Sequence, residues 1–542
     1  MRVRYRRAAL LLMVLGLLTA ACGGGQAGTS GEDGGFSVYI HEPQNPLIPS
    51  DTHESEGATV LKPLFTGLII YDSETSEPIN AMAESITSPD QRVWTITIKS
   101  GWTFHDGTPV TAQSYVNGWN FGAYGPNAQG TTNFYANISG YDDLQCGQGP
   151  DGEIDCDASP PKATQMSGLK VIDDTTFQVT LTDPFSQFPV TLGYHPFLPV
   201  PDALMRDPQA YGEQPIGNGP FMMDGPWQHN QFIRMKRFPG YAGTPAKAEA
   251  VEFRIYLSDQ TAYNDLVGGQ LDIMDQVPTD KISVAERDLD GRYFERPRSD
   301  LTFIGFPLYR PEFQNPKLRI AFSKAIDRAE IAEKIFNGAR TPAFGYVSPL
   351  VIGSRADPCG YNCEYDPAEA KRLFDEAGGF SGQLELWFNE GAGHEAWMEA
   401  LANQISKNLG IKPPVFKQFD FAEYLNFLEN KQSSGPYRLG WIMDYPSPQD
   451  YLEPVFSTAG SSNYFSYSNP QVDRLITRGN AAGSVDQGIP FYHQAEDQIL
   501  QDMPAIPLFY GRVNAGYSTR VDNVVIDTRG DYDIANVTVV RQ

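Results

Sequence analysis

The chain has one long apolar run, and it lies at the N-terminus. Residues 8–21 are uncharged and mostly apolar, and the four arginines among residues 1–7 precede them without an acidic residue. Such a run is too short to cross a bilayer, which takes about 20 residues, but it is typical of an export signal. No apolar run of 18 residues follows, so we expect the rest of the chain to fold outside the membrane.

A cysteine directly follows this run. Leu18-Thr19-Ala20-Ala21 leads into Cys22 and then into three glycines. The pattern resembles the lipobox of bacterial lipoproteins, in which the signal is removed and the new N-terminal cysteine is lipidated. We therefore predict a signal peptide over residues 1–21, and a lipidated Cys22 with a flexible tether over residues 22–35. An ordinary secretory signal with an incidental cysteine is the alternative.

The other four cysteines form two pairs of near neighbours in the sequence. An exported protein enters an oxidising compartment, where such neighbours usually form disulfides. We predict no metal site, because the seven histidines are scattered and none stands at ligand spacing from a cysteine. The two predicted disulfides join Cys146 to Cys156 and Cys359 to Cys363.

Length and charge exclude further classes of protein. The chain has 542 residues, enough for about three to four domains. Its formal net charge is −25, and residues 22–542 carry −29 because residues 1–21 hold four arginines and no acid. Such a surface repels phosphate backbones, and no basic stripe interrupts it. We therefore expect no nucleic-acid partner.

Local patterns predict a mixture of helices and strands. Apolar and polar residues alternate from Val93 to Lys99, as in a half-buried strand, and Thr111 is placed to cap a following helix. Asn315 and Pro316 predict the start of a helix that continues to Gly338, and Asp366 predicts the start of another that ends at Ala377. Further strands are predicted over residues 251–255 and 383–387.

The motifs of common hydrolases and nucleotide-binding enzymes are absent. There is no G-x-S-x-G elbow and no phosphate-binding loop. His394-Glu395 begins like a zinc-binding helix, but Met398 stands where the second histidine belongs. We therefore predict no enzyme activity and no cofactor. A secreted hydrolase stays open as an alternative, because a pair of carboxylates can act without a recognisable motif.

Eight segments in a fixed order resemble the family 5 extracellular solute-binding proteins of ABC importers, in particular the oligopeptide- and dipeptide-binding lipoproteins. The resemblance covers essentially the whole chain after the tether. One of the segments is Gly440-Trp441-Ile442-Met443-Asp444, which keeps the glycine, tryptophan and aspartate of the family. The eight segments are residues 64–72, 83–85, 94–111, 215–221, 269–273, 319–328, 365–370 and 440–446.

The resemblance implies an α/β, periplasmic-binding-protein-like fold. Two discontinuous α/β lobes are joined by a hinge and close around a ligand, and an α+β domain is inserted early in the chain. In this sequence, lobe I is expected over residues 36–60, 198–297 and 505–542. The inserted domain II is expected over residues 61–197, and lobe III over residues 298–504.

The resemblance also implies the residues of the binding site. Asp444 matches the acid that pairs with the α-ammonium of the ligand, and a carboxylate in a dry cleft suits that cation. An Asp444 that pairs only inside its own lobe is the alternative. Gly440 and Ile442 match main-chain positions that pair with the ligand as an added strand. The remaining candidates are Arg438 near the ligand's carboxylate, Trp441 and Tyr445 as stacking surfaces, and Tyr135 from domain II.

Together these features predict an extracytoplasmic receptor that binds its ligand without chemistry. We expect a monomer, anchored to the cell membrane by lipid at Cys22, that captures short peptides and delivers them to an ABC permease. Three alternatives stay open. The same fold binds oligosaccharides or other small solutes in some relatives, the chain could be a secreted hydrolase, and a peptide receptor could signal rather than transport.

Overall fold

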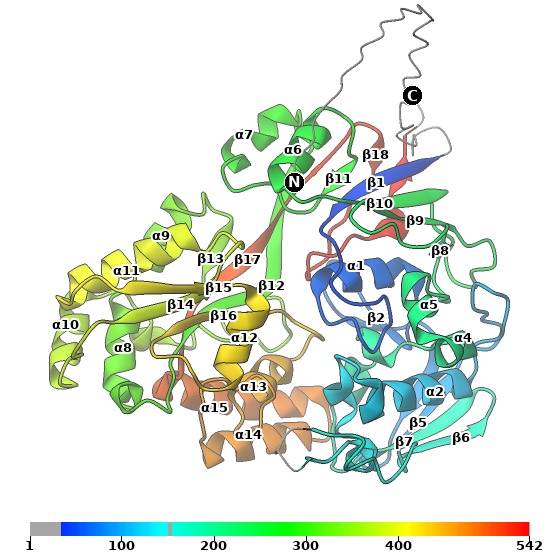
Figure 1. Cartoon of the computed structure of the whole chain (residues 1–542), viewed down its shortest axis with the longest axis horizontal. Helices are drawn as coiled ribbons and strands as arrows, with labels where there is room; N and C mark the ends of the chain where they lie inside the picture. Colours follow the sequence, from blue (N-terminus) through cyan, green and yellow to red (C-terminus); the bar gives the residue numbers. More distant parts are fainter. Residues whose placement is uncertain (1–33, 150–153, 541–542) are drawn as a thin grey trace, which may run out of the picture.

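Two long antiparallel strands, β12 (Tyr293–Gly305) and β17 (Ala505–Tyr517), run through the middle of the molecule and link its two sides (Figure 1). The structure is a computed structural model that describes residues 34–149 and 154–540. The predicted signal peptide, Cys22 and residues 22–33 of the predicted tether lie outside the described residues. Within them, no helix is long and apolar enough to cross a membrane.

A mixed sheet forms the backbone of the fold. Among the described residues it has 11 strands in the order β15-β14-β16-β12-β17-β11-β1-β10-β9-β8, with β13 beside β17. Besides β12 and β17, its strands are β1 (Gly35–Ile40), β8 (Phe221–Met223), β9 (Phe232–Arg237), β10 (Ala250–Ile255), β11 (Ile273–Met274), β13 (Arg340–Pro342), β14 (Glu385–Asn389), β15 (Val415–Phe419) and β16 (Tyr437–Trp441).

The pairing of β12 with β17 is interrupted near its middle. Tyr293 to Pro297 pair with one end of β17, and Leu301 to Gly305 pair with its other end. The register shifts between Pro297 and Leu301. A shift of this kind disrupts the ladder and bends the strands locally. The two sides of the molecule are therefore joined through an irregular stretch of two strands.

Three large apolar cores lie around these strands. The first core is built from residues 36–65, 198–273 and 513–537, the second from residues 68–197, and the third from residues 301–510. The first core therefore collects segments from both ends of the chain, as discontinuous lobes require. The exact limits predicted for lobes I and III and domain II stay a prediction.

The helices of this half pack in the first and second cores and in two smaller apolar clusters beside them. Their bounds are α1 (Ser55–Leu64), α2 (Ala112–Ala123), α3 (Phe188–Thr191), α4 (Asp202–Arg206), α5 (Pro208–Glu213), α6 (Asp259–Val267) and α7 (Ile282–Asp288). The smaller strands of this half are β2 (Ile69–Tyr71), β3 (Pro78–Asn80), β4 (Ala83–Thr87), β5 (Val93–Ile98), β6 (Leu169–Asp173), β7 (Thr176–Thr180), β18 (Val521–Asp522) and β19 (Thr538–Val539).

The remaining helices belong to the third core (Figure 1). Their bounds are α8 (Pro316–Lys324), α9 (Arg328–Lys334), α10 (Pro367–Glu376), α11 (Glu395–Leu409), α12 (Phe421–Glu429), α13 (Pro448–Phe456), α14 (Pro470–Asn480) and α15 (Val485–Asp502).

Most of the local predictions are confirmed. The predicted strand is β5, whose residues alternate between half-buried and buried, and its centre packs in the second core. Helix α2 follows Thr111, whose N–H donates to the hydroxyl of Ser114. Asp366 caps α10 by accepting the N–H groups of Ala368 and Glu369 at 3.1 and 3.0 Å.

The helix predicted from Pro316 to Gly338 is wrong in its extent. The chain forms two helices there, α8 and α9, with a break after Lys324. The carboxylate of Asp327 accepts the N–H of Glu330 at 2.9 Å and so begins a new helix. An aspartate at this position competes with the backbone for hydrogen bonds, and this favours a cap over a helix interior.

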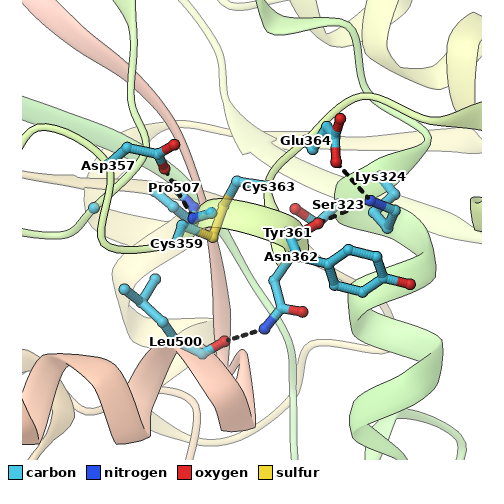
Figure 2. Close-up of a disulfide and its surroundings, with 12 residues drawn as sticks. Ser323, Lys324, Asp357, Cys359, Tyr361, Asn362, Cys363, Glu364, Leu500 and Pro507 are labelled. Carbon is cyan, nitrogen blue, oxygen red and sulfur yellow. Dashed lines mark hydrogen bonds and ion pairs between the residues drawn. A yellow bond between two sulfur atoms is a disulfide. The ribbon is translucent and has the colours of Figure 1, made fainter.

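Both predicted disulfides are present, between Cys146 and Cys156 and between Cys359 and Cys363. Figure 2 shows the second one. Asn362, which lies between its cysteines, donates to the carbonyl of Leu500 at the end of α15. The ammonium of Lys324 at the end of α8 donates to the carbonyl of Tyr361 at 2.8 Å. The disulfide loop therefore connects two helices that are far apart in the sequence.

One buried acid ties the distant segments of the first core together. Asp272 is fully buried and accepts the N–H of Ser37 at 2.9 Å and the hydroxyl of Ser518 at 2.7 Å. Nη1 of Arg520 lies 3.3 Å from Oδ2 of Asp272 and completes the cluster. Asp272 therefore joins β1 to the chain that follows β17.

Asp272→Ala should strongly destabilise the protein. Removal of one partner leaves Arg520 and the hydroxyl and N–H donors uncompensated, which typically costs about 3–5 kcal/mol for a buried charge pair. Thermal unfolding monitored by circular dichroism measures the effect. Asp174→Ala is the control, because Asp174 is exposed. Equal melting temperatures for the two variants would contradict this role of Asp272.

Candidate functional site

Strand β16 has one edge that is only partly paired. On one side it pairs with β12 from Tyr437 to Trp441. On the other side, among the described residues, β14 pairs with it at Tyr437 alone. The edge of β16 beyond Tyr437 is therefore open on the β14 side.

The orientation of this open edge follows from one hydroxyl group. The hydroxyl of Tyr424 donates to the carbonyls of Trp387 and Arg438, at 3.2 and 2.6 Å. The carbonyl of Arg438 thus faces β14. Because the backbone alternates with a period of two residues, the polar groups of Gly440 and Ile442 face the same side. These are the two main-chain positions predicted to pair with a ligand.

A side chain at position 440 has no room. A Cβ atom added to Gly440 would lie 2.9 Å from the carbonyl oxygen of Leu301 on β12. Any larger residue therefore displaces either β12 or the open edge. The glycine therefore permits the close approach of β16 to β12 at this position.

Asp444 lies just beyond the end of this edge, where the three cores meet. It lines a cavity of about 140 Å³. The walls come from α1 and the C-terminal segment of the first core, from residues 67–71 and 193–195 near the second, and from Asp444 itself. Its side chain is 13% exposed.

The partners of Asp444 come from outside its own core. Nη1 of Arg529 lies 3.8 Å from its Oδ1. The charge of Arg529 lowers the pKa of Asp444, and Tyr194, which lines the same cavity, also lowers it. Burial is the largest effect and acts in the opposite direction, so the pKa of Asp444 is raised to about 6. The alternative, in which Asp444 pairs only inside its own lobe, does not describe this arrangement.

The cavity holds more acids than bases. Its lining acids are Asp444, Asp527 and Asp531, whereas Lys62 and Arg529 are its cations. Lys62 pairs with Asp527, and Nε of Arg529 lies 3.5 Å from Asp531. His195 adds no charge, since burial lowers its pKa to about 3. The cavity is therefore suited to one further cation next to Asp444.

Asp450 fixes the backbone of Asp444 through a hydrogen bond. It is fully buried at the first turn of α13, and its Oδ2 accepts the indole N–H of Trp441 at 3.2 Å and the N–H of Asp444 at 3.1 Å. Its Oδ1 has no hydrogen-bond partner among the described residues. Burial, and then the charge of Asp444, raise the pKa of Asp450 well above its usual value.

Basic groups gather near the start of β16. Nη1 of Arg438 donates to Asn389 at 3.2 Å, and its Nε has no partner among the described residues. His394 is 9% exposed; its Nδ1 accepts the indole N–H of Trp397, so its Nε2 carries the proton and is also unpartnered there. Unsatisfied buried donors of this kind favour an anion.

The pKa shifts of the groups around Arg438 also favour an anion at this place. Burial, and then Arg438 and Arg340, lower the pKa of His394 to about 3. Burial also lowers the pKa of Arg438 to about 10. Arg340 pairs with Asp300 at 3.0 Å. The sequence motifs gave no reason to select His394 or Arg340 for this end of the site.

The structure places the aromatic candidates differently. Trp441 is partly buried and its indole is bonded to Asp450. Tyr445 is 5% exposed, and its hydroxyl donates to Gln449 on the following helix. Tyr135 is fully buried in the second core, and its hydroxyl donates to the carbonyl of Pro196. The Tyr135 side chain therefore lies in a core and does not face the cavity.

No group of three or more His, Cys, Asp or Glu side chains in residues 34–149 and 154–540 is arranged to hold a metal ion. Two of the cavity acids, Asp527 and Asp531, instead have Lys62 and Arg529 as ion-pair partners.

Comparison with known proteins identifies the family. Residues 77–463 match the bacterial extracellular solute-binding proteins, family 5, in the middle region. The chain belongs to this family. Its members are binding proteins without enzyme activity, so the hydrolase alternative is removed. The resemblance seen in the sequence motifs is confirmed.

Individual relatives cover nearly the whole chain. The periplasmic oligopeptide-binding protein OppA of Escherichia coli (strain K12) is 26% identical over 482 residues, which are 85% of this chain and 84% of the relative. The probable deoxycholate-binding periplasmic protein YgiS of the same strain is 27% identical and covers 88% of both chains. The structure of the Escherichia coli murein tripeptide binding protein MppA has a TM-score of 0.79 at 20% identity. It covers 94% of this chain and 99% of its own, and it confirms the periplasmic-binding-protein-like fold class.

Asp450→Asn should raise the melting temperature at pH 8. The raised pKa of Asp450 means that the folded state holds its proton more tightly than the unfolded state does. Stability is therefore lost as the pH rises, and the neutral amide, which can still accept both N–H bonds, avoids this loss. We expect a gain of about 1–3 kcal/mol at pH 8 that shrinks at pH 5. A gain that is the same at both pH values would contradict the titration of Asp450.

Proposed function

We propose that this protein captures short peptides in the cleft between the first and third cores and delivers them to an ABC permease. One observation carries the proposal: Asp444 lines a small cavity at the meeting point of the three cores, and the acids of that cavity outnumber its bases. An ammonium group is the ligand that such a cavity favours. The backbone edge of β16 and the basic groups around Arg438 supply contacts for the remainder of a peptide.

The amino end of the ligand binds Asp444. Two unit charges 4 Å apart attract each other by about 4 kcal/mol at the effective dielectric constant of a protein surface. Asp444 is held at the end of β16 by the bond from its N–H to Asp450, so the carboxylate does not have to be ordered when the ligand arrives. Its Oδ1 lies 3.8 Å from Arg529, too far for a hydrogen bond. Lone pairs of the carboxylate are therefore left for an ammonium.

The ligand backbone pairs with Gly440 and Ile442. The polar groups of both residues face the side that β14 leaves open. An extended peptide added there gains main-chain hydrogen bonds without any reading of its side chains. This mode of binding suits a receptor that accepts many sequences.

The carboxylate end of the ligand lies toward Arg438 and His394. These residues carry the buried N–H donors without partners described above. A carboxylate satisfies several such donors at once through charge-assisted hydrogen bonds. A zwitterionic peptide is thus complementary to the acidic end and the basic end of β16.

We further propose that the protein is a monomer held at the outer face of the cell membrane by a lipid on Cys22, after removal of residues 1–21. The two disulfides are consistent with an oxidising compartment outside the cytoplasm. The OppA relative is named as periplasmic. Closure of the cleft around a ligand provides the signal that a permease recognises.

A second candidate is a small solute other than a peptide, because the relative YgiS is named for deoxycholate. A bile acid or a sugar offers no ammonium for Asp444. A free amino terminus on the ligand is therefore the property that separates the two proposals.

Asp444→Asn should weaken the binding of a peptide with a free amino terminus by about 2–5 kcal/mol, since the ammonium loses its charged partner. Isothermal titration calorimetry measures the affinity, with Glu77→Gln as the control for an exposed acid. The same peptide with an acetylated amino terminus should fail to bind the unaltered protein. Equal binding of both peptides, or unchanged affinity in Asp444→Asn, removes Asp444 from the site.

The affinity for such a peptide should also depend on pH, with one decrease on the acid side (the acid limb) and another on the alkaline side. The pKa of unliganded Asp444 is about 6, so affinity falls about tenfold for each pH unit below that value as the carboxyl group becomes protonated. It falls again above about pH 8, where the α-ammonium loses its proton. Calorimetry from about pH 5 to about pH 9 measures both limbs. A flat acid limb would show that no carboxylate with this pKa takes part.

A further inference from the structure

A tight turn of the C-terminal segment carries an arginine into the cavity. Oδ1 of Asp527 accepts the N–H groups of Arg529, Gly530 and Asp531 at 2.8 to 3.0 Å. Gly530 has φ +99°, a conformation that L side chains rarely adopt. These contacts define the backbone of the turn from Asp527 to Asp531.

The turn is fastened to the first core on several sides. Asp527 pairs with Lys62 of α1, and Asp531 accepts the hydroxyl of Thr59 at 2.8 Å. The hydroxyl of Tyr532, the next residue, donates to the carbonyl of Tyr39 near the end of β1 at 2.7 Å. These contacts fix the position of the turn, and therefore the position from which the side chain of Arg529 extends.

That side chain, Arg529, reaches across to the third core. Its Nη1 donates to the carbonyl of Met443, the residue before Asp444, and lies 3.8 Å from the Asp444 carboxylate. Its Nε lies 3.5 Å from Asp531, and its guanidinium lies 5.9 Å from the ring of Tyr194. Only 14% of the side chain is exposed. The guanidinium therefore contacts both the backbone and the charge of the segment that bears Asp444.

We propose that Arg529 is a positioning residue for Asp444: from its rigid turn it holds the Met443–Asp444 segment in place and keeps the Asp444 carboxylate ionised to receive a ligand cation. This inference rests on the proposed function for the identity of that cation. No motif of the sequence marks Arg529, which lies 85 residues after Asp444 in the chain.

The titratable groups that face Asp444 come from every element around the cavity. Burial has the largest effect on the pKa of Asp444 and raises it, whereas the charge of Arg529 and the neighbouring Tyr194 lower it. Asp450 on α13 faces Asp444 as well, and the charge of Asp444 raises the pKa of Asp450. The titratable groups that line the cavity with Asp444 are Lys62, Tyr71, Tyr194, His195, Asp527, Arg529 and Asp531.

The contacts of Arg529 favour a supporting role over competition with the ligand. Its hydrogen bond goes to the Met443 carbonyl and not to the Asp444 carboxylate. A guanidinium 3.8 Å away stabilises the negative charge but does not occupy the lone pairs of the oxygen. An ammonium can therefore bind Asp444 while Arg529 stays in place.

The first experiment measures peptide affinity against pH in Arg529→Gln and Arg529→Lys by calorimetry. Loss of the positive charge should move the acid limb upward from about pH 6 by about one pH unit, since an opposite charge at this distance lowers a carboxyl pKa by about 1–3 units. Affinity at pH 8 should stay within about threefold, because Asp444 is ionised there in both proteins. Arg529→Lys keeps the charge and should restore the original limb.

Two results would overturn the proposal. A loss of affinity by the same factor at every pH indicates that Arg529 serves only the structure. A gain of about tenfold or more at pH 8 in Arg529→Gln indicates that the guanidinium competes with the ligand cation for the carboxylate.

A second experiment needs no ligand. The melting temperatures of the protein, Arg529→Gln, Asp444→Asn and the double variant form a cycle that isolates the interaction between the two residues. Arg529→Gln should cost more stability in the protein that keeps Asp444 than in the Asp444→Asn variant, and the difference should be larger at pH 8 than at pH 5. Additive effects at both pH values contradict the proposal.

The two experiments also separate this inference from the proposed function. If Asp444→Asn binds peptide normally while the cycle shows coupling, the peptide assignment fails and the pairing of Arg529 with Asp444 stands. If the cycle is additive while Asp444→Asn loses binding, the peptide assignment stands and Arg529 has no part in it.

Discussion

An excess of negative charge inside a small cavity is the constraint on which the site depends. A carboxylate with little access to water is costly unless a cation compensates it. Lys62 compensates Asp527, and Arg529 compensates Asp531. Among the described residues, the closest cationic nitrogen to Asp444 is Nη1 of the same Arg529, which lies 3.8 Å from Oδ1. The unliganded protein therefore carries a penalty at Asp444, which is visible in its raised pKa. A ligand cation relieves that penalty, and relief of an existing penalty is an efficient source of binding energy.

The position of the cavity makes this local charge a property of the whole molecule. Its walls belong to three cores, and the first and third cores are joined by β12 and β17, whose pairing is interrupted between Pro297 and Leu301. Under the proposed function, a ligand cation that bridges Asp444 to the opposite wall stabilises the arrangement in which the walls are close. Differential contacts of this kind are what shift an equilibrium between open and closed states.

Patterns within short segments of the sequence predicted much of the fold. The alternation in β5, the cap of α10 and both disulfides are local features, and all are present. The break between α8 and α9 was missed because the apolar spacing continues through it, whereas Asp327 begins a new helix. Family motifs, rather than local physics, directed attention to Asp444.

The partners of Asp444 could not be predicted in this way. Tyr194 and Arg529 lie 250 residues before it and 85 residues after it, and only the assembled fold brings them together. For the same reason the sequence could not show that Tyr135 and Tyr445 are directed away from a ligand. Their hydroxyl groups form hydrogen bonds inside the protein, with Pro196 and Gln449. His394 was not predicted as a site residue, although its neighbour Arg438 was. Its Nε2–H has no partner among the described residues, and only the structure reveals this.

The most direct test of the account is a crystal structure of the protein purified with the ligand that it retains from its host, together with the mass of that ligand. The account predicts a peptide along the open edge of β16, with its amino nitrogen about 3 Å from the carboxylate of Asp444. A neutral ligand, or a ligand elsewhere in the cleft while Asp444 faces only Arg529, would contradict it.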